Sequence, residues 1–185
     1  MARGRPSKKQ LILDTAQRLF SERGYQGTTI DLVVQSAGVS KPTVYSHFPS
    51  KQALWQAMLE QAIAASEEQR ATLDIEAVGW FELIPGGFAQ LASQPQMLAI
   101  YRIMLGEQHK MEPESRALFS AFEEDLEHWC DRVLKAQMVS LTAEQRFMLR
   151  ALCREGVLQP ALRQQTVPAT GDLSSLIRRA LGAQG

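Results

Sequence analysis

The stretch TTIDLVVQSAGVSKPTVYSHFPSK, residues 28–51, decides the fold of this protein. From Ile30 to Ala37 its apolar side chains recur at the i, i+3, i+4, i+7 spacing of one helix face. The two threonines that open the stretch are suitable N-caps, and Gly38 is a suitable left-handed residue to end the helix. A short amphipathic helix is therefore predicted here, followed by a tight turn.

A second short helix is predicted from Ser40 to about His47. Ser40 can cap it, and Pro42 falls in its first turn, where a missing N–H does no harm. Val44 and Phe48 are four residues apart and can both point inward. Two helices joined by a tight turn that contains glycine are typical of a helix-turn-helix.

The remaining side chains of the second helix suit a DNA surface. Lys41 can donate to guanine, whereas Thr43, Tyr45 and His47 can donate to phosphates. The alternative is a helical hairpin that carries ordinary surface residues.

The core of this region, AGVSKPTVYSHFPSKQAL at residues 37–54, resembles the DNA-binding domain of the tetracycline-repressor (TetR) family of transcriptional regulators. The resemblance extends from about Lys8 to Leu59, and the rest of the chain resembles the family only in length and helical character. The segments that carry it are Gly38-Val39-Ser40 for the turn, Thr43-Val44-Tyr45 with His47-Phe48 for the recognition helix, and Lys51 at the start of the fourth helix.

The resemblance implies two kinds of DNA contact. It also shows a departure, because Ile30 stands where some relatives carry a base-contacting arginine, so we expect that contact to be missing. The implied DNA-binding residues are Lys41, Pro42 and Tyr45 facing base edges, and Thr29, Thr43, His47 and Lys51 facing phosphates.

Charge is distributed unevenly along a chain of 185 residues whose formal net charge is zero. Residues 1–51 carry eight Lys or Arg and three Asp or Glu, a net charge of +5, and the remaining 134 residues carry −5. This asymmetry is typical of a DNA-binding head joined to a body that does not bind DNA.

Composition predicts a packed globular protein of the cytoplasm. Hydrophobic residues make up 45% of the chain, and no apolar run approaches the length of a membrane span. The basic N-terminal residues are not followed by the apolar segment of a secretory signal. Cys130 and Cys153 form no CxxC pair, so we expect reduced, partly buried thiols, with a redox sensor as the alternative.

An all-α fold with two domains is predicted, a DNA-binding helix-turn-helix domain at residues 1–50 and a helical ligand-binding and dimerisation domain at 51–185. Residues 1–6 should be disordered, and Arg3, Arg5, Lys8 and Lys9 form either a minor-groove arm or a solvated tail. The first helix is predicted to open with a Ser7–Gln10 capping box, to end at Arg23-Gly24, and to bury Leu11, Ile12, Ala16, Leu19 and Phe20.

Periodicity predicts further helices in the body. The fourth helix runs from Lys51 to about Thr72, and a helix over about 76–93 either kinks at Pro85-Gly86-Gly87 or divides in two. One further helix is predicted to begin at Pro95, a long one to end near Lys135, and another to begin at a Thr142–Gln145 capping box. Loops are predicted over 106–113 and 159–171. The last helix has an apolar stripe that is expected to lie at or beside a dimer interface: Leu173, Leu176, Ile177, Ala180 and Leu181.

No catalytic, cofactor or metal site is predicted. The three histidines stand in different segments, outside any metal-binding frame. The acidic run of Glu123, Glu124, Asp125 and Glu127 fits the solvated face of a long helix whose dry face carries Phe122, Leu126 and Trp129.

The resemblance implies that the body encloses a ligand pocket, and its methionine and aromatic side chains suit a mostly apolar effector of unknown identity. The alternative is that these residues are simply core. The candidate ligand-binding residues are Trp80, Phe88, Met97, Tyr101, Met104 and Trp129.

These observations predict a homodimeric repressor that a small ligand releases from double-stranded operator DNA. The rival hypothesis is a DNA-bound adaptor of the same fold that acts through protein contacts and has no small-molecule ligand. A closed body core would favour the adaptor.

Overall fold

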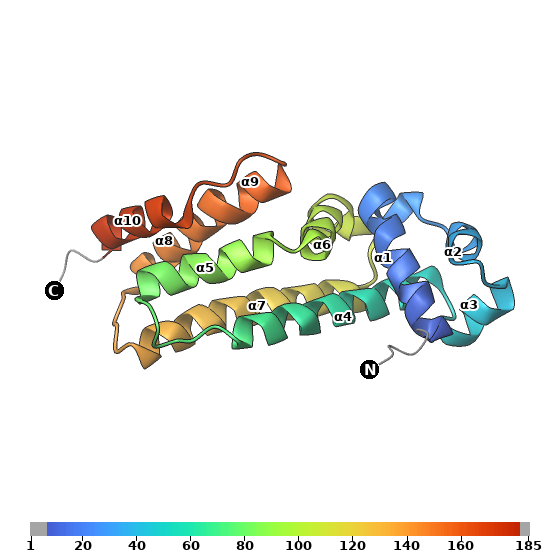
Figure 1. The fold of residues 1–185 in the computed structure, drawn as a ribbon, viewed down its shortest axis with the longest axis horizontal. Helices are drawn as coiled ribbons and strands as arrows, with labels where there is room; N and C mark the ends of the chain where they lie inside the picture. Colours follow the sequence, from blue (N-terminus) through green and yellow to red (C-terminus); the bar gives the residue numbers. More distant parts are fainter. Residues whose placement is uncertain (1–6, 182–185) are drawn as a thin grey trace, which may run out of the picture. The chain divides into compact units, whose positions relative to one another are not determined.

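The computed structural model describes residues 7–181, and every regular element in that range is helical (Figure 1). The chain divides into two compact units. Of the described residues, unit 1 holds 7–64 together with Ala99–Phe119, and unit 2 holds Ala65–Leu98 together with 120–181. Neither unit ends at residue 50, and the predicted division into a DNA-binding domain and a body stays a prediction. Between residues 7 and 181, no helix has the length and hydropathy needed to span a membrane.

Unit 1 is built around the N-terminal helices, which pack on one another. Lys8 and Lys9 begin α1 and so do not belong to a flexible arm, whereas Arg3 and Arg5 lie outside the described residues. The elements that contribute to unit 1 are α1 (Lys8–Gly27), α2 (Ile30–Ala37), α3 (Lys41–His47), η1 (Gln108–Lys110) and parts of α4 (Lys51–Ala71), α6 (Pro95–Glu107) and α7 (Pro113–Ala136).

The start of α1 differs from the prediction in two details. The Ser7 hydroxyl accepts the Gln10 amide N–H at 3.1 Å, but the Gln10 side chain donates to Asp14, so the reciprocal half of the capping box is absent. Leu11 is 38% exposed, and Leu13 is buried instead. The buried stripe follows Ile12, Ala16, Leu19 and Phe20, and Leu11 falls beside it.

The core of unit 1 is aromatic. The Trp55 ring meets Phe20 edge-on at 5.2 Å between centroids and Tyr25 at 5.6 Å. Tyr101 and Met104, two of the candidate ligand-binding residues, are buried in the same unit. The Tyr101 ring meets Phe119 edge-on at 5.0 Å.

Unit 2 contains the remaining helices, and Figure 1 shows α10 lying alongside α5 and α8, in agreement with their contacts. The predicted capping box at Thr142 and Gln145 is confirmed in both halves. The elements that lie wholly in unit 2 are α5 (Trp80–Ala92), α8 (Ala143–Cys153), the π-helical segment η2 (Arg154–Leu158), α9 (Gln159–Leu162) and α10 (Thr170–Leu181).

Helix α5 corrects the prediction for 76–93. It begins at Trp80, and it continues through Pro85 without dividing. Gln137 sets the start, because its side chain accepts the Trp80 amide N–H at 2.7 Å and donates to the carbonyls of Ile75 and Val78. The backbone before Trp80 is thereby held in turns, one of which Asp74 also stabilises by accepting the Glu76 amide N–H at 2.9 Å.

Two predicted loops are shorter than expected. Gly106 and Glu107 still belong to α6, and the next three residues form a turn of 3-10 helix. The loop predicted over 159–171 is wrong at both ends, because helical structure continues from α8 through η2 to Leu162 and α10 begins at Thr170.

The apolar stripe of α10 is used within the chain. Leu173, Ile177 and Leu181 are buried in unit 2, where α10 packs mainly on α5. Leu176 is 42% exposed, and Ala180 is also exposed. Three members of the stripe are thus not available to a dimer interface, and a position of α10 beside such an interface stays a prediction.

The acidic face of α7 is only partly solvated. Glu123 lies 2.8 Å from Arg154, Glu127 lies 3.7 Å from Arg150, and the next acidic residue, Asp131, lies 3.5 Å from Arg146. The three arginines stand four residues apart, so one face of α8 and of the η2 segment that follows it meets one face of α7.

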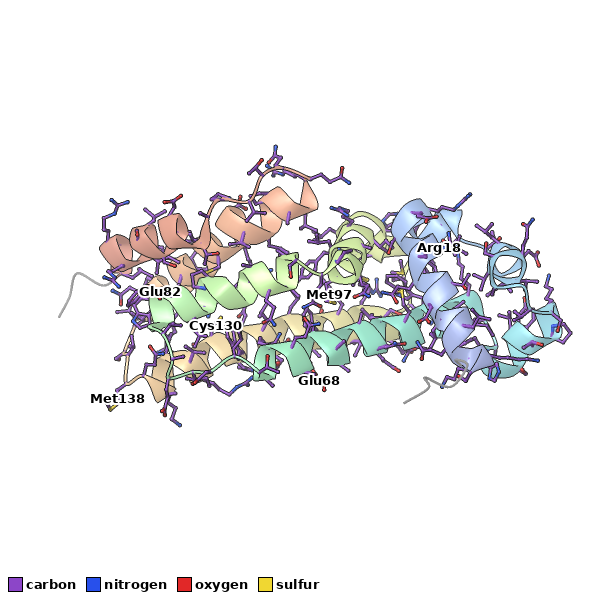
Figure 2. The ribbon with its side chains drawn as sticks, viewed as in Figure 1. Arg18, Glu68, Glu82, Met97, Cys130 and Met138 are labelled. Atoms are coloured by element: carbon purple, nitrogen blue, oxygen red, sulfur yellow. The ribbon has the colours of Figure 1, made fainter. Side chains whose placement is uncertain are left out.

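Both cysteines are buried free thiols in unit 2, and Figure 2 labels Cys130 on α7. Burial raises the pKa of the Cys130 thiol to about 12, and burial also raises the pKa of Cys153. Since the thiolate is the nucleophilic form, protonated buried thiols are poor redox sensors. This environment favours the interpretation of both residues as core.

Candidate DNA-binding site

The turn between α2 and α3 forms as the sequence predicts. The Thr29 hydroxyl accepts the Leu32 amide N–H at 3.2 Å and caps α2. Gly38 ends this helix with φ 63°, a left-handed conformation that glycine adopts without steric cost. The predicted C-terminal glycine is confirmed.

Helix α3 is capped by Ser40, whose hydroxyl accepts the Thr43 amide N–H at 3.3 Å, with Pro42 in the first turn. Val44 and Phe48 are buried and anchor the helix from beneath. The opposite face of α3 is consequently turned to solvent.

That outer face presents most of the predicted DNA contacts. Lys41, Pro42, Tyr45 and His47 are exposed, and Tyr45 retains 43% of its surface although it is aromatic. Thr43 is half-buried, and its hydroxyl lies 2.8 Å from that of Ser40. Exposed donors on a short helix can reach base edges and phosphates together.

Asp31 is a member of this surface that the sequence analysis did not identify. Its carboxylate lies 2.7 Å from the Lys41 ammonium, and this hydrogen bond raises the pKa of Lys41. Both side chains are exposed, so the pair is weak and water can replace it. Lys41 must leave Asp31 before it can donate to a base.

Lys51, the expected phosphate contact, is half-buried in unit 1. Its ammonium donates to the Tyr25 carbonyl at 3.1 Å and lies 4.1 Å from the centroid of the Tyr25 ring. Burial lowers the pKa of Lys51, and the charge of Glu107 opposes this shift. The ammonium has three donors and this bond uses one, so the phosphate contact stays a prediction.

The six candidate ligand-binding residues are all buried. Tyr101 and Met104 belong to unit 1, and the other four belong to unit 2. There the Trp129 indole packs so closely on Gly87 of α5 that a Cβ at that position would overlap it. Trp129 also lines a small surface pocket beside Arg70 and Asp125.

Comparison with known proteins supports this assignment of the N-terminal helices. Residues 12–58 match the sequence profile of bacterial regulatory proteins of the tetR family. A 48-residue stretch is 44% identical to the Staphylococcus aureus (strain Newman) biofilm operon icaADBC HTH-type negative transcriptional regulator IcaR. That stretch covers 26% of this chain and 26% of the relative, so the likeness to IcaR is confined to about a quarter of its length.

Similarity of fold extends over nearly the whole chain. The Bacillus subtilis transcriptional regulator FadR in complex with stearoyl-CoA covers 91% of this chain and 96% of its own, with a TM-score of 0.64 and 18% identity. A regulator from Saccharomonospora viridis in complex with choline covers 92% and 93%, with a TM-score of 0.72 and 18% identity. Residues 12–58 thus match the tetR family of bacterial regulatory proteins, and the likeness to the solved structures shows that the chain shares their fold.

Proposed function

We propose that this protein regulates transcription by binding double-stranded operator DNA through the exposed face of α3. The observation that carries the proposal is the outer face of that helix, which gathers Lys41, Tyr45 and His47 above a buried anchor. The surrounding residues 1–51 carry a net charge of +5, which suits a polyanionic partner. The name of IcaR, a negative regulator, supports repression as the direction of control.

The proposal includes a homodimer, because paired helix-turn-helix units read two half-sites about one helical turn apart. An exposed apolar patch in unit 2 supports it. Phe147 and Met148 are exposed on α8, where they line a shallow pocket together with Ala143, Glu144 and Ala151. Such patches on a surface mark contacts between proteins. A cytoplasmic location belongs to the same proposal.

Selection from a randomised duplex library tests DNA binding directly. We expect the protein to enrich a pseudo-palindromic site, and its affinity for that site to fall steeply with salt because basic groups displace counterions. Fluorescence anisotropy at several salt concentrations gives the slope of log K against log salt. Failure to enrich any site, or an affinity that does not change with salt, would overturn the proposal.

The Lys41–Asp31 pair provides the first prediction on specificity. Lys41→Ala should cost about 1–3 kcal/mol on the selected site and relax the preference at one base position. Asp31→Asn should strengthen binding, because it frees Lys41 and removes a negative charge from the DNA-facing surface. Anisotropy on the selected site and on single-base variants separates the two effects. A Lys41→Ala variant that weakens every sequence equally would assign Lys41 to a phosphate.

We further propose that a small, mostly apolar effector controls the protein and binds in unit 2 among Trp80, Phe88, Met97 and Trp129. Two similar folds are described with bound small molecules, stearoyl-CoA and choline, which supports an effector as a class. In this structure the four side chains are packed and buried, so binding must open the core. Because only a fraction of the molecules is open at any time, the observed affinity is lower than that of the open form by this fraction.

Reciprocity provides the test of this switch. A ligand that weakens DNA binding a hundredfold must itself bind the DNA complex about a hundredfold more weakly, a difference of about 2.7 kcal/mol. Long-chain acyl-CoA and choline are suitable first probes, titrated by calorimetry into the free protein and into the complex with DNA. A ligand that releases heat and binds with equal affinity in both titrations would contradict the proposed switch. The close packing of Trp129 on Gly87 favours the protein-binding adaptor as the second candidate in that event.

A further inference from the structure

Helix α1 is broken near its end, and the break exposes two backbone donors. Gly24 has φ 71° and ψ −179°, a conformation outside the helical region. The residues that follow it therefore lose the helical acceptors of their amide N–H groups. Such successive N–H groups form a small concave site that favours a negative charge.

The carboxylate of Glu107, the last residue of α6, fills this position. Its Oε1 accepts the Tyr25 amide N–H at 3.1 Å, and its Oε2 accepts the Gln26 amide N–H at 3.2 Å. Gly24 is needed for this approach, because a Cβ there would lie 2.9 Å from Oε1. The positive φ and the close carboxylate both require glycine at this position.

The backbone of Tyr25 is also bound through its carbonyl group. The Lys51 ammonium, at the start of α4, donates to the Tyr25 carbonyl, and Lys51 and Glu107 attract each other electrostatically. Three segments distant in the sequence thus meet on the backbone of one residue, entirely within unit 1. Helix α6 begins with Pro95–Leu98, which belong to unit 2, and its remaining residues belong to unit 1.

We propose that Glu107 is a positioning residue for operator binding. Its carboxylate fixes the helix-turn-helix to the end of α6 by accepting the amide N–H groups of Tyr25 and Gln26, and this pair of bonds is called the clamp below. The inference rests on the proposed DNA-binding function. The clamp touches no DNA; it sets the orientation in which α1 presents α2 and α3. It should therefore matter only where two heads must fit two half-sites at a fixed spacing.

The clamp is tested with Glu107→Ala, which removes both bonds, and with Glu107→Gln, which keeps one acceptor oxygen. Hydrogen exchange of the Tyr25 and Gln26 amides should accelerate in the order wild type, Glu107→Gln, Glu107→Ala. Affinity for the selected two-half-site operator should fall about tenfold in Glu107→Ala, since charged hydrogen bonds contribute of that order. Glu114→Gln, an exposed change of equal charge at the start of α7, is the matched control and should leave both quantities unchanged.

A duplex with a single half-site separates positioning from damage to the head. Glu107→Ala should bind it as the wild type does, and the slope of log K against log salt should not change. Equal loss on both duplexes would mean that the head itself is disrupted, and unchanged exchange of the two amides would mean that the clamp is absent; either result overturns the proposal. Amide exchange in the DNA-free protein tests the clamp even if no operator is found, so its failure is distinguishable from failure of the proposed function.

Discussion

Replacement of Phe147 with glutamate is expected to yield a monomer whose affinity for the two-half-site operator is about a hundredfold lower, because the second head no longer binds at high effective concentration. Phe147 is 69% exposed, and it lines a shallow pocket on α8 with Ala143, Glu144, Met148 and Ala151. A two-fold axis through this face would bring the same apolar surface of both protomers together. A charge at its centre would have to be buried without a partner.

Sedimentation velocity and anisotropy measure the two parts of this prediction. Met138→Glu is the matched control, because Met138 is 94% exposed in the turn after α7, away from α8 and α10 (Figure 2). It should remain dimeric and bind DNA as the wild type does. A Phe147→Glu protein that sediments as a dimer would place the interface elsewhere.

The structure also changes which residues of α10 suit such an experiment. Ile177 is fully buried in the packing of unit 2, so a charge there should unfold that unit instead of separating protomers. Leu176 is the exposed leucine of the stripe, and Leu176→Glu should weaken the dimer less than Phe147→Glu because less of its apolar surface is exposed.

The second large effect concerns a buried charge in unit 2. Arg70 is 6% exposed, and its guanidinium donates to Asp125 at 2.6 Å beside the rings of Phe122 and Trp129. Asp125→Ala should destabilise the protein by about 3 kcal/mol, because it leaves a buried cation without its counter-ion. The partial exposure of Asp125 lets water reach part of the site and keeps the cost at the lower end of the range for buried pairs.

Arg70→Met should cost much less, about 1 kcal/mol or below, because an apolar side chain of similar length fills the same space and needs no partner. The double variant Arg70→Met/Asp125→Ala should recover most of the stability lost in Asp125→Ala. Arg132→Met serves as the control, since Arg132 reaches the same carboxylate from an exposed position.

Urea denaturation followed by circular dichroism and by tryptophan fluorescence gives the free energies of this cycle. Equal losses in Asp125→Ala and Arg70→Met would show that the attraction between the two groups, and not the burial of Arg70, controls stability. Coincidence of the two probes is required before the free energies are compared.

Much of the helix-turn-helix could be predicted because its signals are local. Thr29, Ser40 and Thr142 cap helices through bonds to residues three positions away, and Gly38 ends α2 by its own backbone conformation. Such interactions are complete within one helical turn, so the order of residues specifies them. The face of α3 that carries Lys41 and Tyr45 follows from the same periodicity.

Contacts between distant segments decided what the sequence did not. Gln137 sets the start of α5 from 57 positions away, and Glu107 reaches the backbone of Tyr25 across 82 positions. A glutamine and a glutamate at the ends of helices carry no signal of such partners, because their partners are backbone groups that any residue possesses. Sequence thus determined α2, α3, the turn between them and the exposed face of α3. Tertiary structure alone decided where α5 begins, which part of the α10 stripe is buried and how the end of α1 is clamped.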